Sequence, residues 1–222
     1  KKNTNYFKLK HMKKTLLFAV VASFAANAQV REKGEIEIAP FIGISSANYY
    51  GDVGVLNESI QNPYFGVNAD FFMSNRWSFR TGIEYQKMGS TAPLYNDYGT
   101  FSIREKLDFI SVPIHANYHF GSTRKWYLNF GPTVSFLTKA TSNGVDIKHG
   151  MNSVQMGLGL GIGYKFEINE NFSIGIDHQE YISVVNNLEF NSSRSNPYIG
   201  NYFGSFSVKA IFKLGSKSTS EN

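Results

Sequence analysis

The chain of 222 residues contains no cysteine. This absence excludes a disulfide framework, a thiolate metal site, a cysteine nucleophile and a lipid-modified cysteine behind a signal peptide. The sequence also lacks any apolar run approaching the roughly 20 residues that a membrane-spanning helix needs. If the protein enters a membrane, we therefore expect it to do so with strands.

The net charge is also close to zero once residues 1–28 are left out of the count. Six of the 22 Lys and Arg, and none of the 17 Asp and Glu, lie before residue 29. The rest of the chain carries 16 basic and 17 acidic residues, a formal net charge of −1. The high overall pI therefore gives no support to nucleic-acid binding, and no nucleic-acid partner is expected.

The positive charge of the N-terminal segment has its own explanation. Lys13 and Lys14 precede the apolar stretch Leu16 to Phe24, and Ala26-Asn27-Ala28 forms a small-x-small cleavage site. This pattern predicts a secretory signal peptide that is removed on export. We divide the chain into an upstream extension (1–11), a signal peptide (12–28), a β-barrel (29–214) and a short polar periplasmic tail (215–222).

The most informative segment is SVQMGLGLGIGYKFEI, residues 153–168. Its apolar residues take every second position, while glycine or polar residues fill the gaps, which is the period of a β-strand. An apolar face of this length opposite a small or charged face is typical of a strand with lipid outside and a polar lumen inside.

Seven further segments repeat this pattern after residue 29. The eight predicted strands are Glu35 to Ser46, Tyr64 to Met73, Ser78 to Gly89, Leu107 to Phe120, Trp126 to Thr138, Ser153 to Ile168, Phe172 to Val185 and Tyr202 to Leu214. Their lengths suit tilted strands that span a bilayer. Since edges cannot stay unpaired in hydrocarbon, the sequence predicts an all-β, eight-stranded antiparallel up-and-down transmembrane barrel.

The predicted links alternate between short and long. The short links are Ser74 to Trp77, Gly121 to Lys125 and Asn169 to Asn171; the long ones are Ala47 to Pro63, Ser90 to Lys106, Ala140 to Asn152 and Asn186 to Asn201. Short turns of outer-membrane barrels are periplasmic and long loops extracellular, so both chain ends are expected in the periplasm of a cell with an outer membrane. The long loops are rich in Asn, Ser, Tyr and Gly, and they either carry specificity or only cap the barrel.

Aromatic residues flank both sets of links and predict two girdles at the membrane interfaces. The set near the short turns is Phe71, Phe72, Trp77, Phe79, Tyr118, Phe120, Trp126, Tyr127, Phe166 and Phe172. The set near the long loops includes Tyr64, Phe65, Tyr85, Phe136, Tyr181 and Tyr202.

Charged residues at the inward positions predict a filled lumen. They are Glu37, Asp70, Arg80, Glu84, His115, Lys165, Asp177 and Lys209. An eight-stranded barrel has room only for side chains, so we expect these groups to neutralise one another and plug the lumen. A gated path for ions or solutes is the alternative. Pro40, Pro113 and Pro132, near strand middles, predict β-bulges.

Residues 105–137 also carry a family resemblance. Leu107 and Phe109, the pair Val112-Pro113, the strand Ile114 to Phe120 and the segment Tyr127 to Pro132 resemble the PorT-type outer-membrane β-barrel proteins of Bacteroidetes. The resemblance extends over essentially all of the chain after the leader, through strand number, leader and loop alternation. The resemblance implies an outer-membrane barrel. One member of that family is needed for type IX secretion. The shared positions Pro113, Gly131 and Pro132 look structural, so the resemblance implies no catalytic residue.

Enzymatic barrels make one local pattern worth testing. His178, Glu180 and Ile182 share a strand face, and Ser183 follows, so a Ser–His–carboxylate arrangement is conceivable. The alternatives are that the strand leaves the hydrocarbon there or that a bulge turns these groups inward.

Other histidines and glycines give weaker signals. His115 and His119, four residues apart on a strand, are separated by about 13 Å and cannot share one metal ion. His149 near Asp146 is expected in a solvated loop, and the alternate glycines Gly157 to Gly163 lack the helix start of a nucleotide-binding loop. We predict no catalytic, cofactor-binding or metal residues and no cofactor.

These observations favour a non-enzymatic outer-membrane barrel with a structural, adhesive or secretion-associated role. A narrow porin for small solutes and a lipid-modifying enzyme, such as a lipid A deacylase or acyltransferase, remain the alternatives. Outer-membrane lipid and envelope or secretion-system proteins are the expected partners.

Overall fold

The computed structural model describes residues 31–52, 56, 58–96, 99–188 and 198–214. The predicted extension, signal peptide and tail lie outside these residues. The described elements are β1 (Ile36–Gly51), β2 (Ile60–Phe72), β3 (Trp77–Asn96), β4 (Gly99–Pro113), β5 (His115–Phe120), β6 (Trp126–Ser142), β7 (Val145–Asp146), the 3₁₀ turn η1 (Lys148–Gly150), β8 (Val154–Glu167), β9 (Phe172–Ser183) and β10 (Ile199–Leu214). In this part of the chain no helix is long and apolar enough to cross a membrane.

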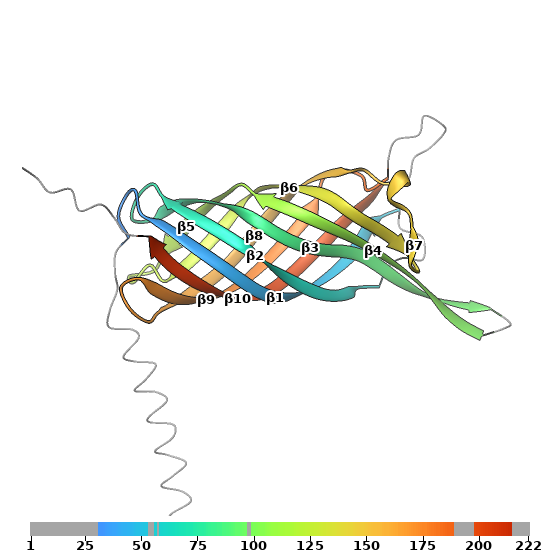
Figure 1. The fold of residues 1–222 in the computed structure, drawn as a ribbon, viewed down its shortest axis with the longest axis horizontal. Coiled ribbons are helices and arrows are strands. Elements are labelled where there is room, and N and C mark those ends of the chain that lie inside the picture. The colour runs from blue at the N-terminus through green and yellow to red at the C-terminus, as the bar shows by residue number, and fades with distance from the viewer. Residues whose placement is uncertain (1–30, 53–55, 57, 97–98, 189–197, 215–222) are drawn as a thin grey trace, which may run out of the picture.

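The strands close into one antiparallel ring. Each strand pairs with its sequence neighbours, β4 and β5 form one wall segment interrupted at Ile114, and the two-residue β7 is a side branch on β6. The first and last strands pair from Ile36 with Leu214 to Gly51 with Ile199, with a gap at Ala39 and Pro40. Figure 1 shows the tilted strands winding around a single barrel. The predicted eight-stranded up-and-down barrel is therefore confirmed.

Alternation along the strands separates an outer and an inner surface. In β8, Leu158 is 56% exposed on the outside, whereas Lys165 is 1% exposed on the inside. The predicted faces hold in β2, β3, β4, β5 and β10 as well, with apolar residues outside and polar residues inside. The barrel wall thus carries an outer apolar band around a polar interior, the arrangement that suits a surrounding lipid.

The polarity of the alternation inverts toward the long-loop end. In β4, Val112 faces outward and Ser111 inward, but further along the same strand Lys106 and Asp108 face outward while Leu107 is buried inside. The expectation of a polar lumen is therefore right only for one half of the barrel. Beyond the apolar band the wall is surrounded by water, so the apolar side chains gain by turning inward, as in a soluble barrel.

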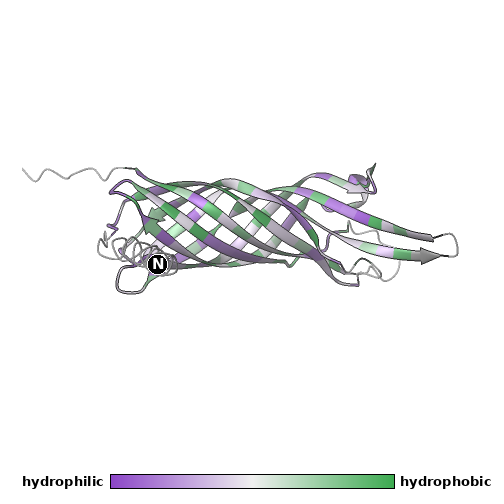
Figure 2. Ribbon diagram, turned by 90° about the horizontal axis from the view of Figure 1, so that it is seen from below, coloured by the Kyte–Doolittle hydropathy of each residue, from purple (hydrophilic) through white to green (hydrophobic). Residues whose placement is uncertain are grey.

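Three of the predicted long loops are shorter than expected because the strands continue past the apolar band. β1 reaches Gly51 and β2 starts at Ile60, and β6 continues to Ser142. The predicted loop Ser90 to Lys106 is a hairpin in which β3 and β4 pair from Ser90 with Glu105 to Asn96 with Gly99. Figures 1 and 2 show this hairpin projecting past the rim of the barrel. A search for outward apolar residues misses these extensions because their outward residues are mostly polar.

The predicted bulges at the prolines are wrong. Pairing is lost on one side at Pro40, around Pro113 and at Pro132, yet the register is the same before and after each of them. Proline removes one backbone donor, which breaks the ladder with one neighbour without inserting a residue. In the pairing of β4 with β6, the register instead shifts between Asp108 and Phe109.

The aromatic girdles need a smaller correction. At the short-turn end, ring contacts link outward residues of neighbouring strands, such as Trp77 with Tyr118 at 4.7 Å and Trp126 with Tyr164 at 4.9 Å between centroids. Four predicted girdle members are buried inside the barrel instead: Phe72, Tyr127, Tyr64 and Tyr181. Two aromatic residues that are adjacent on a strand cannot both face outward.

Candidate functional site: the lumen and the outer wall

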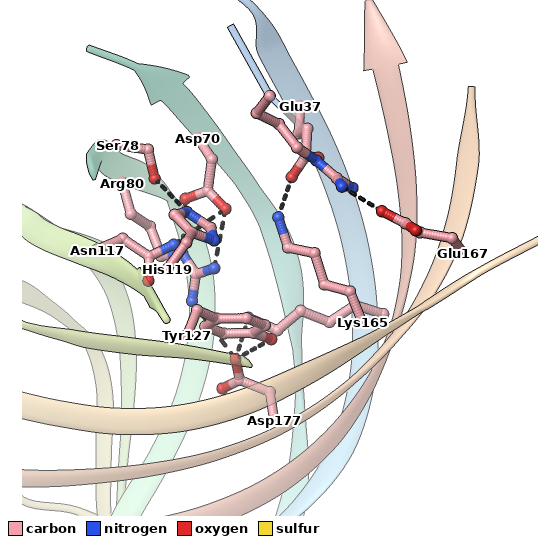
Figure 3. A network of polar contacts seen from close by, with 12 residues as sticks. Glu37, Asp70, Ser78, Arg80, Asn117, His119, Tyr127, Lys165, Glu167 and Asp177 are labelled. Carbon is pink, nitrogen blue, oxygen red and sulfur yellow. Dashed lines mark hydrogen bonds and ion pairs between the residues drawn. The ribbon is translucent and has the colours of Figure 1, made fainter. Parts of the chain in front are cut away.

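The centre of the lumen is a set of ion pairs around Arg80 of β3. Its guanidinium binds both carboxylate oxygens of Asp70, at 2.8 and 2.9 Å, and reaches Asp177 of β9 at 3.4 Å. Lys209 of β10 lies 3.1 Å from Asp177, and the Tyr127 hydroxyl donates to the same carboxylate at 2.6 Å. Figure 3 shows Asp70, Arg80, Tyr127 and Asp177 pointing toward one another inside the barrel, from β2, β3, β6 and β9 respectively.

A second set of ion pairs closes the mouth of the lumen at the short-turn end. Lys165 binds Glu37, and Arg31 binds Glu37 at 2.8 Å. Arg31 also binds Glu167, which lies 3.5 Å from Lys125. Sequence reasoning missed Arg31 and Lys125 because they lie outside the strands, where the period-two pattern says nothing about direction. It also missed Glu167, the last residue of β8. The signal that could have found them is the presence of charges of both signs next to strand ends that face one another across the barrel.

The two lumen histidines have separate partners. The His119 ring nitrogen Nε2 lies 3.0 Å from the Ser78 hydroxyl, and the ring packs on Phe72. His115 lies between Asn129 at 3.1 Å and Thr133 at 3.0 Å. Among the described residues no group of three His, Cys, Asp or Glu is placed to hold a metal ion.

All eight charged residues assigned to the lumen are buried inside the barrel: Glu37, Asp70, Arg80, Glu84, His115, Lys165, Asp177 and Lys209. Glu84 accepts hydrogen bonds from Tyr64 at 2.8 Å and Gln86 at 3.1 Å. The cavity beside them has a volume of about 20 Å³, which is room for about one water molecule. The geometry is that of a packed plug.

Apolar side chains fill the lumen at the long-loop end. This apolar plug consists of Phe41, Ala47, Tyr49, Ile60, Tyr64, Met88, Leu107, Phe109, Leu137, Ala140, Met151, Tyr181 and Phe203. Tyr49 donates a hydrogen bond to Glu105 at 3.0 Å, in the part of β4 beyond the apolar band. Burial raises the pKa of the Glu105 carboxyl, and the hydrogen bond from Tyr49 opposes this change.

The tested catalytic pattern does not assemble. The ring nitrogen Nε2 of His178 lies 2.8 Å from Glu180 Oε1, so the pair is real, but it lies on the outer face of β9. Ser183 faces the lumen, where its hydroxyl accepts a hydrogen bond from the Asn201 backbone N–H at 2.7 Å. The interpretation of a bulge is wrong, because both side chains lie on the outer face and β9 keeps one register with β8 and β10. Beyond the pair, Ile182 and Val184 are again exposed and apolar.

The remaining sequence signals have structural explanations. The alternate glycines of β8 face the lumen, where a Cβ on Gly161 would overlap Gln179 and one on Gly163 would overlap Tyr127. Asp146 and His149 line a surface pocket of about 410 Å³, and Asp146 accepts a hydrogen bond from the Lys148 backbone N–H at 2.8 Å.

Comparison with known proteins shows the family to which this barrel belongs. The family model described as outer membrane protein beta-barrel domain matches residues 27–189. The chain belongs to this family. It is therefore an outer-membrane β-barrel protein of the cell outer membrane, and its apolar band faces lipid.

Solved structures of similar fold come from the same class of protein. The outer membrane protein OprG from Pseudomonas aeruginosa is 11% identical, with 86% of this chain and 100% of that chain covered and a TM-score of 0.52. The outer membrane protein AlkL, determined in DMPC lipid bilayers, is 11% identical over 88% of this chain and 97% of that chain, with a TM-score of 0.47. No curated protein matches the sequence. At these identities the likeness concerns the fold alone.

Proposed function

We propose that this chain is a non-enzymatic outer-membrane barrel that acts through its long-loop end, as a structural, adhesive or secretion-associated component. The observation that supports it is the combination of a lumen filled by ion pairs and an apolar plug with a β3–β4 hairpin that projects beyond the barrel. A filled interior leaves the exterior of the long-loop end as the surface available for recognition.

In this proposal the long-loop end faces the outside of the cell, both chain ends lie in the periplasm, and residues 12–28 are the export signal. Arg31 binds Glu167 at the end of β8, and Leu214 pairs with Ile36 at the start of β1, so both described ends lie at the short-turn end of the barrel. This supports a common location for both termini. Thr100 at the long-loop end and Glu170 in a short turn are both exposed. In intact cells, an impermeant maleimide should label Thr100→Cys and spare Glu170→Cys; the reverse labelling would contradict the orientation.

The resemblance to PorT-type proteins supports envelope or secretion-system proteins as partners, beside the surrounding lipid. A variant that lacks residues 92–103 and closes the hairpin with a two-residue turn tests this proposal. Cross-linked envelopes should yield co-purified partners with the intact chain and lose them with the shortened hairpin, while heat-modifiable migration shows that both barrels fold. A variant with Gly150→Ala, at an open surface position, serves as the matched control. Unchanged partners in the shortened variant would contradict a role for the hairpin.

A lipid-modifying enzyme is the rival proposal with a defined test. It would need a nucleophile beside His178, and the Ser183 hydroxyl is on the other side of the wall. We expect the mass of lipid A to be the same in cells with the wild-type chain and with His178→Ala. A change that depends on His178 would establish enzymatic activity and overturn the proposal.

A further inference from the structure

A row of large apolar side chains marks the long-loop edge of the lipid-facing band on four neighbouring strands. The pairing register places its members at one level: Phe65, Tyr85, Ile110 and Phe136. The rings of Phe65 and Tyr85 stack at 4.9 Å between centroids. Aromatic residues of membrane barrels take this level at the interface between hydrocarbon and headgroups. Lipid headgroups therefore lie beside the next outward residues of these strands.

Those next residues are mostly basic. Lys87 of β3 and Lys139 of β6 lie on either side of Asp108 of β4, and Lys106 is the following outward residue of β4. Neighbouring strands are about 4.8 Å apart and residues rise by about 3.4 Å, so the three lysines start within about 10 Å of one another. Lys87 lies 3.4 Å from Asp108, whereas none of the described carboxylates forms an ion pair with Lys106 or Lys139. Two of the three ammonium groups are thus left for an anion from outside the chain.

A β-bulge directs Lys139 to this face. Leu137 is buried in the lumen, and in a regular strand Lys139, two residues later, would also point inward. The register shifts between Asp108 and Phe109, where β6 carries Thr138 as an extra residue, so Lys139 is exposed on the outside. The Thr138 hydroxyl donates to the backbone oxygen of Asp108 at 2.8 Å and holds the bulge. Bulges next to functional sites re-aim a side chain in this way.

The excess of positive charge is local. Beside and beyond the three lysines, the outward charges of the described residues balance, with Arg104 and Lys148 against Glu58 and Asp146. At the same end of β1, β2, β8, β9 and β10, the described outward residues include no lysine or arginine. An anion at the headgroup level is therefore attracted to one side of the barrel.

An apolar groove runs along the outer wall from this side toward the short turns. Its volume of about 520 Å³ falls in the range of about 300–1,000 Å³ that is usual for small-molecule sites. Tyr85 lines the groove next to Lys87, whose ammonium lies 5.8 Å from the Tyr85 ring centroid, and Ala69 lines it closer to the short turns. Gly66 and Gly82 contribute only backbone to its floor. The wall thus offers an apolar groove in the lipid-facing band with cations at its headgroup end.

We propose that Lys87, Lys106 and Lys139, the basic patch, bind the phosphate of an anionic lipid, one acyl chain of which lies in the groove. Lysine binds phosphate as a compact positive charge, and basic residues beside the membrane surface attract anionic headgroups. Only a phosphate that carries hydrocarbon chains matches both the cations and the apolar groove below them. The site depends on wall residues alone, so it would exist whichever side of the membrane the long-loop end faces.

Quenching of a single tryptophan by brominated lipid measures which lipid occupies the wall beside that residue. Trp77→Phe and Trp126→Phe remove the native tryptophans, and a new one is placed beside the groove as Val112→Trp or on the far wall, in β9, as Ile176→Trp. The full chain is folded in vesicles of phosphatidylcholine and phosphatidylglycerol, with one of the two lipids brominated. We expect phosphatidylglycerol to be preferred at least threefold at Val112→Trp and to show no preference at Ile176→Trp. Equal preferences at the two positions would overturn the proposal.

The second arm removes the cations. Adding Lys106→Gln and Lys139→Gln should abolish the preference at Val112→Trp. The matched control, Lys33→Gln with Arg76→Gln, removes the same charge from exposed positions at the short-turn end and should keep the preference. A preference that survives the loss of Lys106 and Lys139 would overturn the proposal.

The third arm fills the groove and offers a free anion. Ala69→Phe should lower the preference at least twofold, because a lipid whose chain is displaced no longer holds its phosphate beside the lysines. Ala210→Phe, on the outer face of β10, should leave it unchanged. Inorganic phosphate should give the same preference as sodium chloride of equal ionic strength. An unaltered preference in Ala69→Phe, or its specific loss in phosphate, would show a site for a soluble anion and contradict the lipid site. Heat-modifiable migration verifies that every barrel is folded.

Discussion

The hydroxyl of Tyr127 on β6 donates a 2.6 Å hydrogen bond to Asp177 on β9, across the intervening strand β8. Gly163 of β8 lies between them, and a Cβ at that position would overlap the Tyr127 ring. The ring is further held by Arg80, whose guanidinium lies 4.8 Å from its centroid. Glycine on β8 is thus required by the packing of a tyrosine that belongs to another strand.

This contact makes Gly163 sensitive to the smallest enlargement. We expect Gly163→Ala to lower the free energy of unfolding in lipid vesicles by about 1–3 kcal/mol, because the added methyl must displace a ring that is fixed on two sides. Gly150→Ala, where a Cβ meets nothing within 4 Å, should change it by less than about 0.5 kcal/mol. Equal effects at the two positions would show that the ring gives way freely.

Arg80 should matter far more than an ion pair at the edge of the band. Arg80→Met leaves Asp70 buried without its bidentate partner, and we expect a loss of about 3–5 kcal/mol in denaturant unfolding. Lys87→Met, which removes a pair with Asp108 at 3.4 Å on the outer surface, should cost about 0–1 kcal/mol. The combined variant Asp70→Asn, Arg80→Met should recover part of the loss; no recovery would mean that packing, not charge, is responsible.

The filled lumen predicts that the barrel does not conduct ions. In planar bilayers the folded chain should give no steady conductance, because ion pairs and the apolar plug occupy both halves of the interior. Steady single-channel steps that vanish when a lumen position is blocked would support the porin alternative and contradict the closed interior.

The inversion of polarity along β4 can be located with single cysteines in this cysteine-free chain. A water-soluble maleimide should label Asp108→Cys rapidly in vesicles, whereas Val112→Cys should react at least tenfold more slowly because it faces lipid. Unfolding in denaturant should bring both to the same rate. Equal rates in the folded state would place the edge of the apolar band elsewhere.

Glu105 gives the extension a dependence on pH. Because burial raises its pKa in the folded state, the folded chain holds a proton that the unfolded chain releases. The hairpin should therefore lose stability as the pH rises above the ordinary Glu pKa of about 4.3. Glu105→Gln should abolish this dependence, measured as hydrogen exchange of β4 amides after correction for the intrinsic rate. A dependence that persists in Glu105→Gln would assign it to another group.

Strand number, closure and facing were predictable because each depends on local alternation. Lys165 and Lys209 were placed in the lumen correctly from their neighbours alone. The extensions were not predictable in this way, since Leu107 and Lys106 alternate with the opposite polarity and indicate water outside the wall. This inverted alternation can be interpreted only when the height of the membrane edge on the neighbouring strands is known.

The sequence could not predict which inward residues form ion pairs with one another in the lumen. It showed that Arg80 and Asp177 point inward, but the pairing of two residues on opposite walls depends on the stagger of strands around the ring. For the same reason the sequence could join His178 and Glu180 on one face and could not decide whether that face meets lipid or lumen.

The sequence by itself determined an eight-stranded wall with an apolar outside, because a period of two residues assigns every side chain to one face. Only the tertiary structure decided which inward groups neutralise one another, where the wall leaves the apolar band and that the His178–Glu180 pair lies on the outer face of the wall. Those properties depend on closure and register, which bring together residues that are distant in the chain.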